Sequence, residues 1–133
     1  MRVFADTHFF IALLSERDTA HEAALRRQRE MDCHELVTTG WVLVELADGM
    51  TLPGEREVCA AFIECLRRAS GTRIVPLSEE LLWRGFDLYR RRQDKDWSLT
   101  DCISFVVMSD EGLSEALTGD HHFEQAGFTA LLA

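Results

Sequence analysis

The sequence predicts an α/β fold, a three-layer α/β/α sandwich built on a mainly parallel sheet of about five strands. Short apolar runs of strand type alternate along the chain with longer segments whose apolar residues have helical spacing. This alternation is typical of parallel strands joined by helices that cover the sheet. The length of 133 residues, 47% of them hydrophobic, suits one core of ordinary size, and we expect residues 1–133 to form a single domain.

Five short segments are predicted to be strands because each is apolar or rich in β-branched residues and is bounded by glycine, proline or polar residues. They are residues 2–5, 34–39, 73–77, 115–118 and 128–132. Pro76 places the third of them at an edge or a strand end, since proline cannot donate to a ladder. Residues 121–127 between the last two strands are predicted to be a short helix or a loop.

Helices are predicted where apolar residues recur with helical spacing, at residues 9–14, 23–29, 41–49, 55–69 and 81–92 and in a buried segment that begins at Ser98. Thr19 with Glu22, Ser78, and Ser98 with Asp101 are candidate N-caps, the last pair as a capping box. Gly49 is expected to end the helix before it. The arginines at 90–92 suit a helix C-terminus, and an RNA-facing patch is the alternative.

The sequence predicts a soluble, cytosolic protein without a membrane partner. No stretch approaches the roughly 20 apolar residues of a membrane span, and the N-terminus becomes acidic too soon for a signal peptide. The cysteines Cys33, Cys59, Cys65 and Cys102 have no C-x-x-C spacing, so we expect them to be buried free thiols.

Three carboxylates lie where an apolar element begins or ends, and a fourth lies alone within an apolar element. Asp6 follows the first strand, Asp120 follows the fourth, Asp101 lies in the first turn of a helix, and Glu45 is surrounded by apolar neighbours. Strand carboxyl ends and the helix N-termini after them share one edge of a parallel sheet, so these acids can converge. Capping would also explain Asp6 and Asp101, and an exposed helix stripe would explain Glu45. Asp48 is a possible auxiliary ligand.

Clustered carboxylates raise one another's pKa, and Mg²⁺ or Mn²⁺, which prefer oxygen ligands, would relieve the repulsion. Such ions activate water and stabilise the attacking and leaving oxygens of a phosphodiester. They would also offset the net charge of −9, which otherwise disfavours a nucleic-acid partner. The chain lacks the P-loop, G-x-G-x-x-G and G-x-S-x-G motifs. Zinc at His121 and His122 is not expected, because no cysteine or H-x-x-x-H pattern accompanies them.

Four motifs, taken in order, resemble the PIN domains and, within them, the VapC-type toxins of bacterial toxin–antitoxin pairs. They are Asp6-Thr7, Glu45 in the helix after the second strand, the run from Trp97 to Cys102, and the run from Leu117 to Phe123. The resemblance implies a Mg²⁺- or Mn²⁺-dependent endoribonuclease for single-stranded RNA, usually a homodimer, inhibited by a cognate antitoxin whose tail occupies the acidic groove. It implies that Asp6, Glu45, Asp101 and Asp120 are catalytic metal-binding acids, supported by the hydroxyls of Thr7 or Ser98.

Two other functions remain open on the sequence. In the first, the acidic face binds a basic protein and the acids serve as caps and solubilising charge, so no stoichiometric metal site exists. In the second, the chain is a phosphoacceptor receiver domain. That class usually needs an acidic pair after the first strand and a late lysine, whereas Asp6 stands alone and Lys95 is the only lysine.

Overall fold

The computed structural model describes residues 2–31 and 35–133 and has one five-stranded sheet in the order β3-β2-β1-β4-β5. All neighbouring strands pair in parallel. The strands are β1 (Arg2–Ala5), β2 (Glu35–Thr39), β3 (Thr72–Val75), β4 (Glu115–Leu117) and β5 (Thr129–Ala130). The predicted α/β class is therefore confirmed, with a shorter last strand than expected; the predicted start of the second strand at His34 lies outside the described residues.

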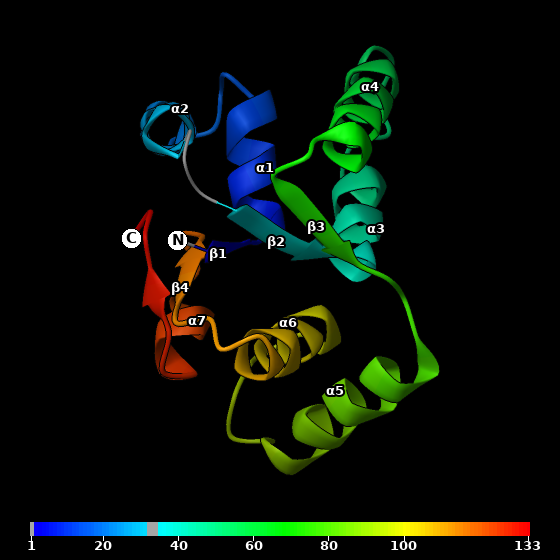
Figure 1. Ribbon diagram of the computed structural model, residues 1–133, viewed down its shortest axis with the longest axis vertical. Coiled ribbons are helices and arrows are strands. Elements are labelled where there is room, and N and C mark those ends of the chain that lie inside the picture. The colour runs from blue at the N-terminus through cyan, green and yellow to red at the C-terminus, as the bar shows by residue number, and fades with distance from the viewer. Residues whose placement is uncertain (1, 32–34) are drawn as a thin grey trace.

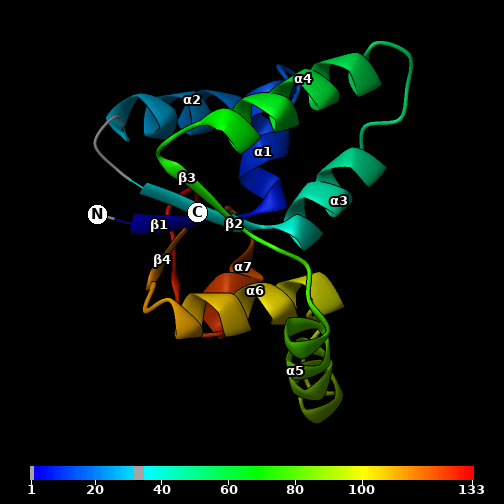
Figure 2. The same cartoon turned by 45° about the vertical axis from the view of Figure 1, so that its right-hand side comes forward.

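Helices cover both faces of the sheet (Figures 1 and 2). They are α1 (Thr7–Leu14), α2 (His21–Glu30), α3 (Gly40–Asp48), α4 (Glu55–Arg68), α5 (Glu79–Arg91), α6 (Leu99–Asp110) and α7 (His121–Gln125). Figure 2 shows α1, α2 and α4 above the sheet and α5, α6 and α7 below it, with α3 beyond the ends of β1 and β2. Within the described residues, no helix is long and apolar enough to cross a membrane.

Aromatic side chains fill the core between the sheet and α6. Phe4 of β1 lies against Phe123 with ring centroids 6.2 Å apart, and Phe105 of α6 meets Phe123 edge-to-face at 5.0 Å. Trp97, just before α6, packs edge-to-face on Phe105 at 5.0 Å. Because most of α6 is buried, this packing fixes the position of the helix N-terminus and of Asp101 in its first turn.

Local capping follows the sequence at two helices and departs from it at one. Ser78 accepts a hydrogen bond from the Leu81 N–H at 3.2 Å, and the Ser98–Asp101 capping box is present. The predicted Thr19 cap is wrong: α2 has no side-chain cap, and Asp18 Oδ1 instead accepts the Ala20 N–H at 2.8 Å. Aspartate competes well for such a turn because its carboxylate reaches a backbone N–H two residues on.

Gly40 begins α3 directly after the end of β2, and the Thr39 hydroxyl caps this helix by accepting the Val42 N–H at 3.1 Å. The expectation that the cysteines are buried needs correction at one position. Cys59 and Cys102 are buried as expected, but Cys65 is exposed on α4; its helix packs on one face only. Cys33 lies outside the described residues.

Gly85→Ala should destabilise the protein, because a Cβ at this buried α5 position would lie 2.3 Å from Ile103 Cγ1 and 3.1 Å from Ile103 Cα. We expect overpacking of about 1–3 kcal/mol to outweigh the helix propensity that alanine adds. Gly49→Ala is the matched control, since its Cβ would meet nothing closer than 3.6 Å. Urea denaturation of both variants measures the difference, and equal stabilities would contradict the close α5–α6 contact.

Candidate active site

The central strand β1 and its neighbour β4 end side by side, and this brings distant acids to one edge of the sheet. The Asp6 N–H donates to the Leu117 carbonyl at 3.3 Å, so the residues that follow the two strands are held together. The charges of Asp101 and Glu45 both raise the pKa of Asp6, and that of Asp120 raises the pKa of Asp101. The four predicted acids therefore lie in one electrostatically connected group.

Asp6 occupies the N-cap position of α1 but makes no capping hydrogen bond with its side chain. Only 5% exposed, it accepts a hydrogen bond from the Thr118 hydroxyl at Oδ2, 3.0 Å away. Burial raises its pKa to about 7; the Thr118 hydrogen bond lowers it in part, and the charges of Asp101 and Glu45 add smaller upward contributions. Helix capping therefore does not explain Asp6, and its carboxyl group is available to bind another group.

Asp101 both caps α6 and faces the other acids. Its Oδ2 accepts the Ser98 N–H at 3.1 Å, while the Ser98 hydroxyl accepts the Asp101 N–H at 3.0 Å. Burial raises the Asp101 pKa although the Ser98 and His122 hydrogen bonds lower it. Its Oδ1 accepts no hydrogen bond from any described residue. The capping alternative is therefore correct for one oxygen only.

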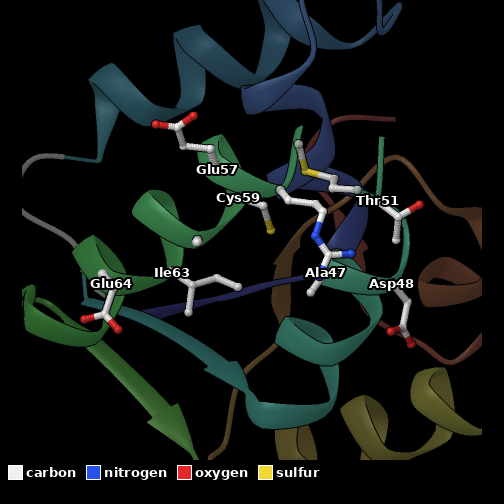
Figure 3. A pocket seen from close by; sticks show the side chains of 10 residues that line it. Ala47, Asp48, Thr51, Glu57, Cys59, Ile63 and Glu64 are labelled. Atoms are coloured by element: carbon white, nitrogen blue, oxygen red, sulfur yellow. The ribbon is translucent and has the colours of Figure 1, made fainter. Parts of the chain in front are cut away.

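Glu45 lies on the inward side of α3, where the Thr7 hydroxyl donates a hydrogen bond to its Oε1. The residue is half-buried, so the alternative of an exposed outer stripe does not hold for Glu45. Asp48, one turn further, is exposed and lines a separate hollow of about 740 Å³ between α3 and α4. Figure 3 shows Asp48 there with Cys59 and Ile63, and none of the four acids lines this hollow.

Asp120 and His122 complete the group from the start of α7. Asp120 Oδ1 accepts the His122 N–H at 2.9 Å, and His122 Nδ1 lies 3.3 Å from that oxygen and 3.1 Å from Asp101 Oδ2. Ligand atoms of Asp120, His121 and His122 all lie within 4.8 Å of one another. Spacing alone does not single out His122, because two adjacent histidines without a cysteine or an H-x-x-x-H pattern form no zinc motif.

Thr118 is the second residue that sequence reasoning missed. Completely buried, it donates to Asp6 and accepts the Asp120 N–H at 3.0 Å, so one hydroxyl links two of the acids. His8 Nδ1 accepts the Gly119 N–H at 3.1 Å, and a Cβ at Gly119 would lie 2.8 Å from the His8 ring. The sequence signal that could have indicated Thr118 is its position between the end of a strand and Asp120.

The donor set fits a hard divalent cation. Carboxylate oxygens dominate the group, two of the acids have raised pKa values, and one Asp101 oxygen is free of hydrogen bonds from described residues. Mg²⁺ and Mn²⁺ prefer oxygen ligands, and a cation removes the repulsion that burial magnifies. No arginine or lysine forms an ion pair with Asp6, Glu45, Asp101 or Asp120 within the described residues.

Comparison with known proteins gives the family. The PIN domain family matches residues 3–129, so the chain belongs to the PIN domain family. A relative named the 23S rRNA-specific endonuclease VapC20, from Mycobacterium tuberculosis, is 26% identical over 131 residues that cover 95% of each chain.

Two solved structures share the fold. The crystal structure of M. tuberculosis VapC20, described as a sarcin-ricin loop cleaving toxin, superposes with a TM-score of 0.86 at 24% identity, covering 96% of both chains. FitAcB from Neisseria gonorrhoeae gives a TM-score of 0.67 at 17% identity over 98% of this chain and 95% of that one. The resemblance drawn from the four sequence motifs is thereby confirmed.

Metal-free protein should lose stability as the pH rises from about 4 to about 7. The folded state keeps a proton on Asp6 up to pH about 7, whereas the unfolded chain releases it near 3.8, so the unfolded state binds fewer protons in this window. One such group contributes at most about 1.4 kcal/mol per pH unit. Asp6→Asn should remove the fall of the unfolding free energy with pH. The difference in unfolding free energy between the variant and wild type, measured in EDTA, should therefore widen as the pH rises. Parallel pH profiles would contradict a buried, repelled carboxyl.

Thr118→Val should destabilise the protein by about 1–3 kcal/mol, because the Asp120 N–H and Asp6 lose a buried partner while the side-chain shape is kept. Thr118→Ser keeps the hydroxyl and should cost less. Denaturant unfolding of the two variants separates the hydrogen bonds from packing. A serine variant as unstable as the valine variant would show that the lost methyl group, and not the hydroxyl, accounts for the effect.

Proposed function

We propose that this PIN-domain chain is a Mg²⁺- or Mn²⁺-dependent endoribonuclease that hydrolyses phosphodiester bonds of single-stranded RNA, as the toxin of a type II toxin–antitoxin pair. The observation that carries the proposal is the buried Asp6 carboxyl, which makes no capping hydrogen bond and is grouped with Asp101 and Glu45; burial and, to a smaller extent, their charges raise its pKa. A fold needs no such cluster for stability, since each buried like charge costs free energy. A cation and a phosphate explain it.

The proposed metal-binding acids are Asp6, Glu45, Asp101 and Asp120. When bound, the divalent ion supplies positive charge for the phosphodiester and lowers the pKa of water at the site. The chain's own groups orient these acids: Thr118 holds Asp6, Thr7 holds Glu45, and the Ser98 N–H holds Asp101. Burial around Asp6 keeps bulk water away and strengthens every charge interaction there.

The substrate and partners follow from the relatives and the charge. The name of VapC20 points to ribosomal RNA, so a sarcin–ricin-type RNA hairpin is the first structured substrate to test beside unstructured RNA. The net charge of −9 suits a cognate antitoxin whose basic tail enters the acidic groove. We include in the proposal a homodimer, a cytoplasmic location, and residues 1–133 acting as one domain.

Asp101→Asn and Asp6→Asn should each reduce RNA cleavage on the order of 10²-fold or more, because losing one charged ligand costs several kcal/mol of stabilisation. Cleavage is measured with Mn²⁺ on a mixed single-stranded RNA pool and on the hairpin. Asp48→Asn is the matched control: it removes a carboxylate from α3 outside the acid group and should retain activity. Full activity in either site variant would refute the assignment.

Calorimetric titration with Mn²⁺ separates the nuclease from the acidic protein-binding alternative. The nuclease predicts a stoichiometric site that is lost in Asp6→Asn and kept in Asp48→Asn. The binding-module alternative predicts no stoichiometric site. Mn²⁺ binding without cleavage of either RNA would support the metal site and would exclude these two RNAs as substrates.

A further inference from the structure

His8, in the first turn of α1, places its ring against the turn that joins β4 to α7. Its Nδ1 accepts the Gly119 N–H at 3.1 Å, although the two residues are 111 positions apart in the chain. Gly119 lies between Thr118, whose hydroxyl donates to Asp6, and Asp120. The ring therefore lies beside the turn that holds one of the proposed metal-binding acids and carries another.

The absence of a side chain at Gly119 leaves room for this ring. A Cβ at position 119 would lie 2.8 Å from His8 Cε1 and 3.2 Å from His8 Nε2, closer than such atoms pack. The backbone conformation does not require glycine here, because Gly119 is not among the glycines with positive φ. Ring and turn are thus fitted closely to each other, and this contact together with the hydrogen bond holds the ring in one orientation.

The tautomer of His8 follows from the Gly119 hydrogen bond. A backbone N–H can donate to Nδ1 only when that nitrogen presents its lone pair, so we assign the ring proton to Nε2. Nε2 has no hydrogen-bond partner among the described residues, and it is not enclosed. In that part of the chain, Ser104 Oγ is the only buried side-chain nitrogen or oxygen without a partner. His8 therefore presents one unused donor to solvent beside the acid group.

A fixed donor without a free acceptor selects a ligand that accepts hydrogen bonds. Nucleobase edges present donors as well as acceptors, whereas each non-bridging phosphate oxygen is an anionic acceptor. Hydrogen bonds to a charged acceptor are also the stronger ones. Phosphate contacts position a nucleic acid without reading its sequence. Nε2 of His8 thus suits the backbone of an RNA that lies at the acid group.

We propose that His8 binds the RNA of the proposed nuclease by donating from Nε2 to a non-bridging phosphate oxygen, in an orientation fixed by Gly119. The inference rests on the proposed function and adds a substrate-binding residue to its four acids. It gives the two ring nitrogens separate tasks: Nδ1 holds the ring on the turn before Asp120, and Nε2 contacts the substrate. His8 is not a metal ligand in this arrangement, because a protonated Nε2 has no lone pair for a cation.

Two substitutions separate the tasks of the two nitrogens. In His8→Asn the amide oxygen is as many bonds from Cβ as Nδ1 is, so it can accept the Gly119 N–H, but the distal donor is lost. In His8→Gln the amide nitrogen is as many bonds from Cβ as Nε2 is, so the donor is kept and the acceptor for Gly119 is lost. Both are made in the Asp101→Asn variant, so that RNA binding with Mn²⁺ is measured without cleavage of the single-stranded RNA pool.

His8→Asn should weaken RNA binding about 10- to 100-fold, the effect of losing one hydrogen bond to a charged group. His8→Gln should keep an RNA affinity close to that of the parent but unfold at a lower urea concentration than His8→Asn, because the Gly119 N–H loses its acceptor. In the chain with Asp101 intact, His8→Asn should raise KM more than it lowers kcat.

His21→Asn is the matched control, because the His21 ring also contacts a backbone atom, the Ala12 carbonyl oxygen at 2.6 Å, and lies outside the acid group. It should leave RNA affinity unchanged. A purely structural role for His8 predicts the reverse order, with RNA affinity kept in His8→Asn and lost in His8→Gln. That order, or equal affinity in both variants and the parent, would overturn the inference.

Two further measurements do not depend on how the variants fold. Nitrogen-15 NMR of the histidine rings in the unaltered chain should show the His8 proton on Nε2, and a proton on Nδ1 instead would overturn the assignment. Calorimetric titration of His8→Asn with Mn²⁺ should give the wild-type stoichiometry and affinity. A lost Mn²⁺ site would make His8 a metal ligand and would reject its role as a phosphate donor.

The two proposals fail in different ways. RNA binding that is lost in His8→Asn, in a wild type that cleaves no RNA, would contradict the proposed function alone. Metal-dependent cleavage in wild type, with the same KM in His8→Asn, would contradict the role of His8 alone.

Discussion

The burial of neighbouring carboxylates at one sheet edge is the constraint on which the site depends. Asp6 and Asp101 are taken from water and placed near further acids, so both resist ionisation. The fold holds them there by giving single oxygens a donor each: Thr118 for Asp6, Thr7 for Glu45, and the Ser98 N–H for Asp101. These hydrogen bonds hold the carboxylates in place, but they are too few to neutralise the negative charge of the acid group.

The parallel sheet makes that gathering possible. β1 lies at the centre, between β2 and β4, so the loops after β1 and β4 begin as neighbours. The apolar α6 is buried along most of its length, and its N-terminus with Asp101 cannot move without opening the aromatic core. Stability and site geometry are thus set by the same packing.

Outside the core, the acidic edge of the sheet and helix α5 present surfaces of different chemistry. The acidic edge presents oxygen ligands, whereas α5 presents aromatic rings flanked by charges and is packed only on its inner side. The chain connects them through the short segment from Arg92 to Ser98, where Arg92 lies over the Trp97 ring at 5.0 Å from its centroid.

The sequence by itself determined the alternation of strands and helices, the Ser98–Asp101 capping box and the four acids, because periodicity, capping and isolated charges are local signals. Only the tertiary structure decided that the Asp6 side chain makes no capping hydrogen bond, that Asp48 lines another hollow, and which residues hold the acids. Thr118 and His122 could not be assigned from spacing, because their partners lie up to 112 residues away. The Thr118–Asp6 hydrogen bond exists only once β1 and β4 lie side by side, and the His122–Asp101 contact only once α7 packs beside α6.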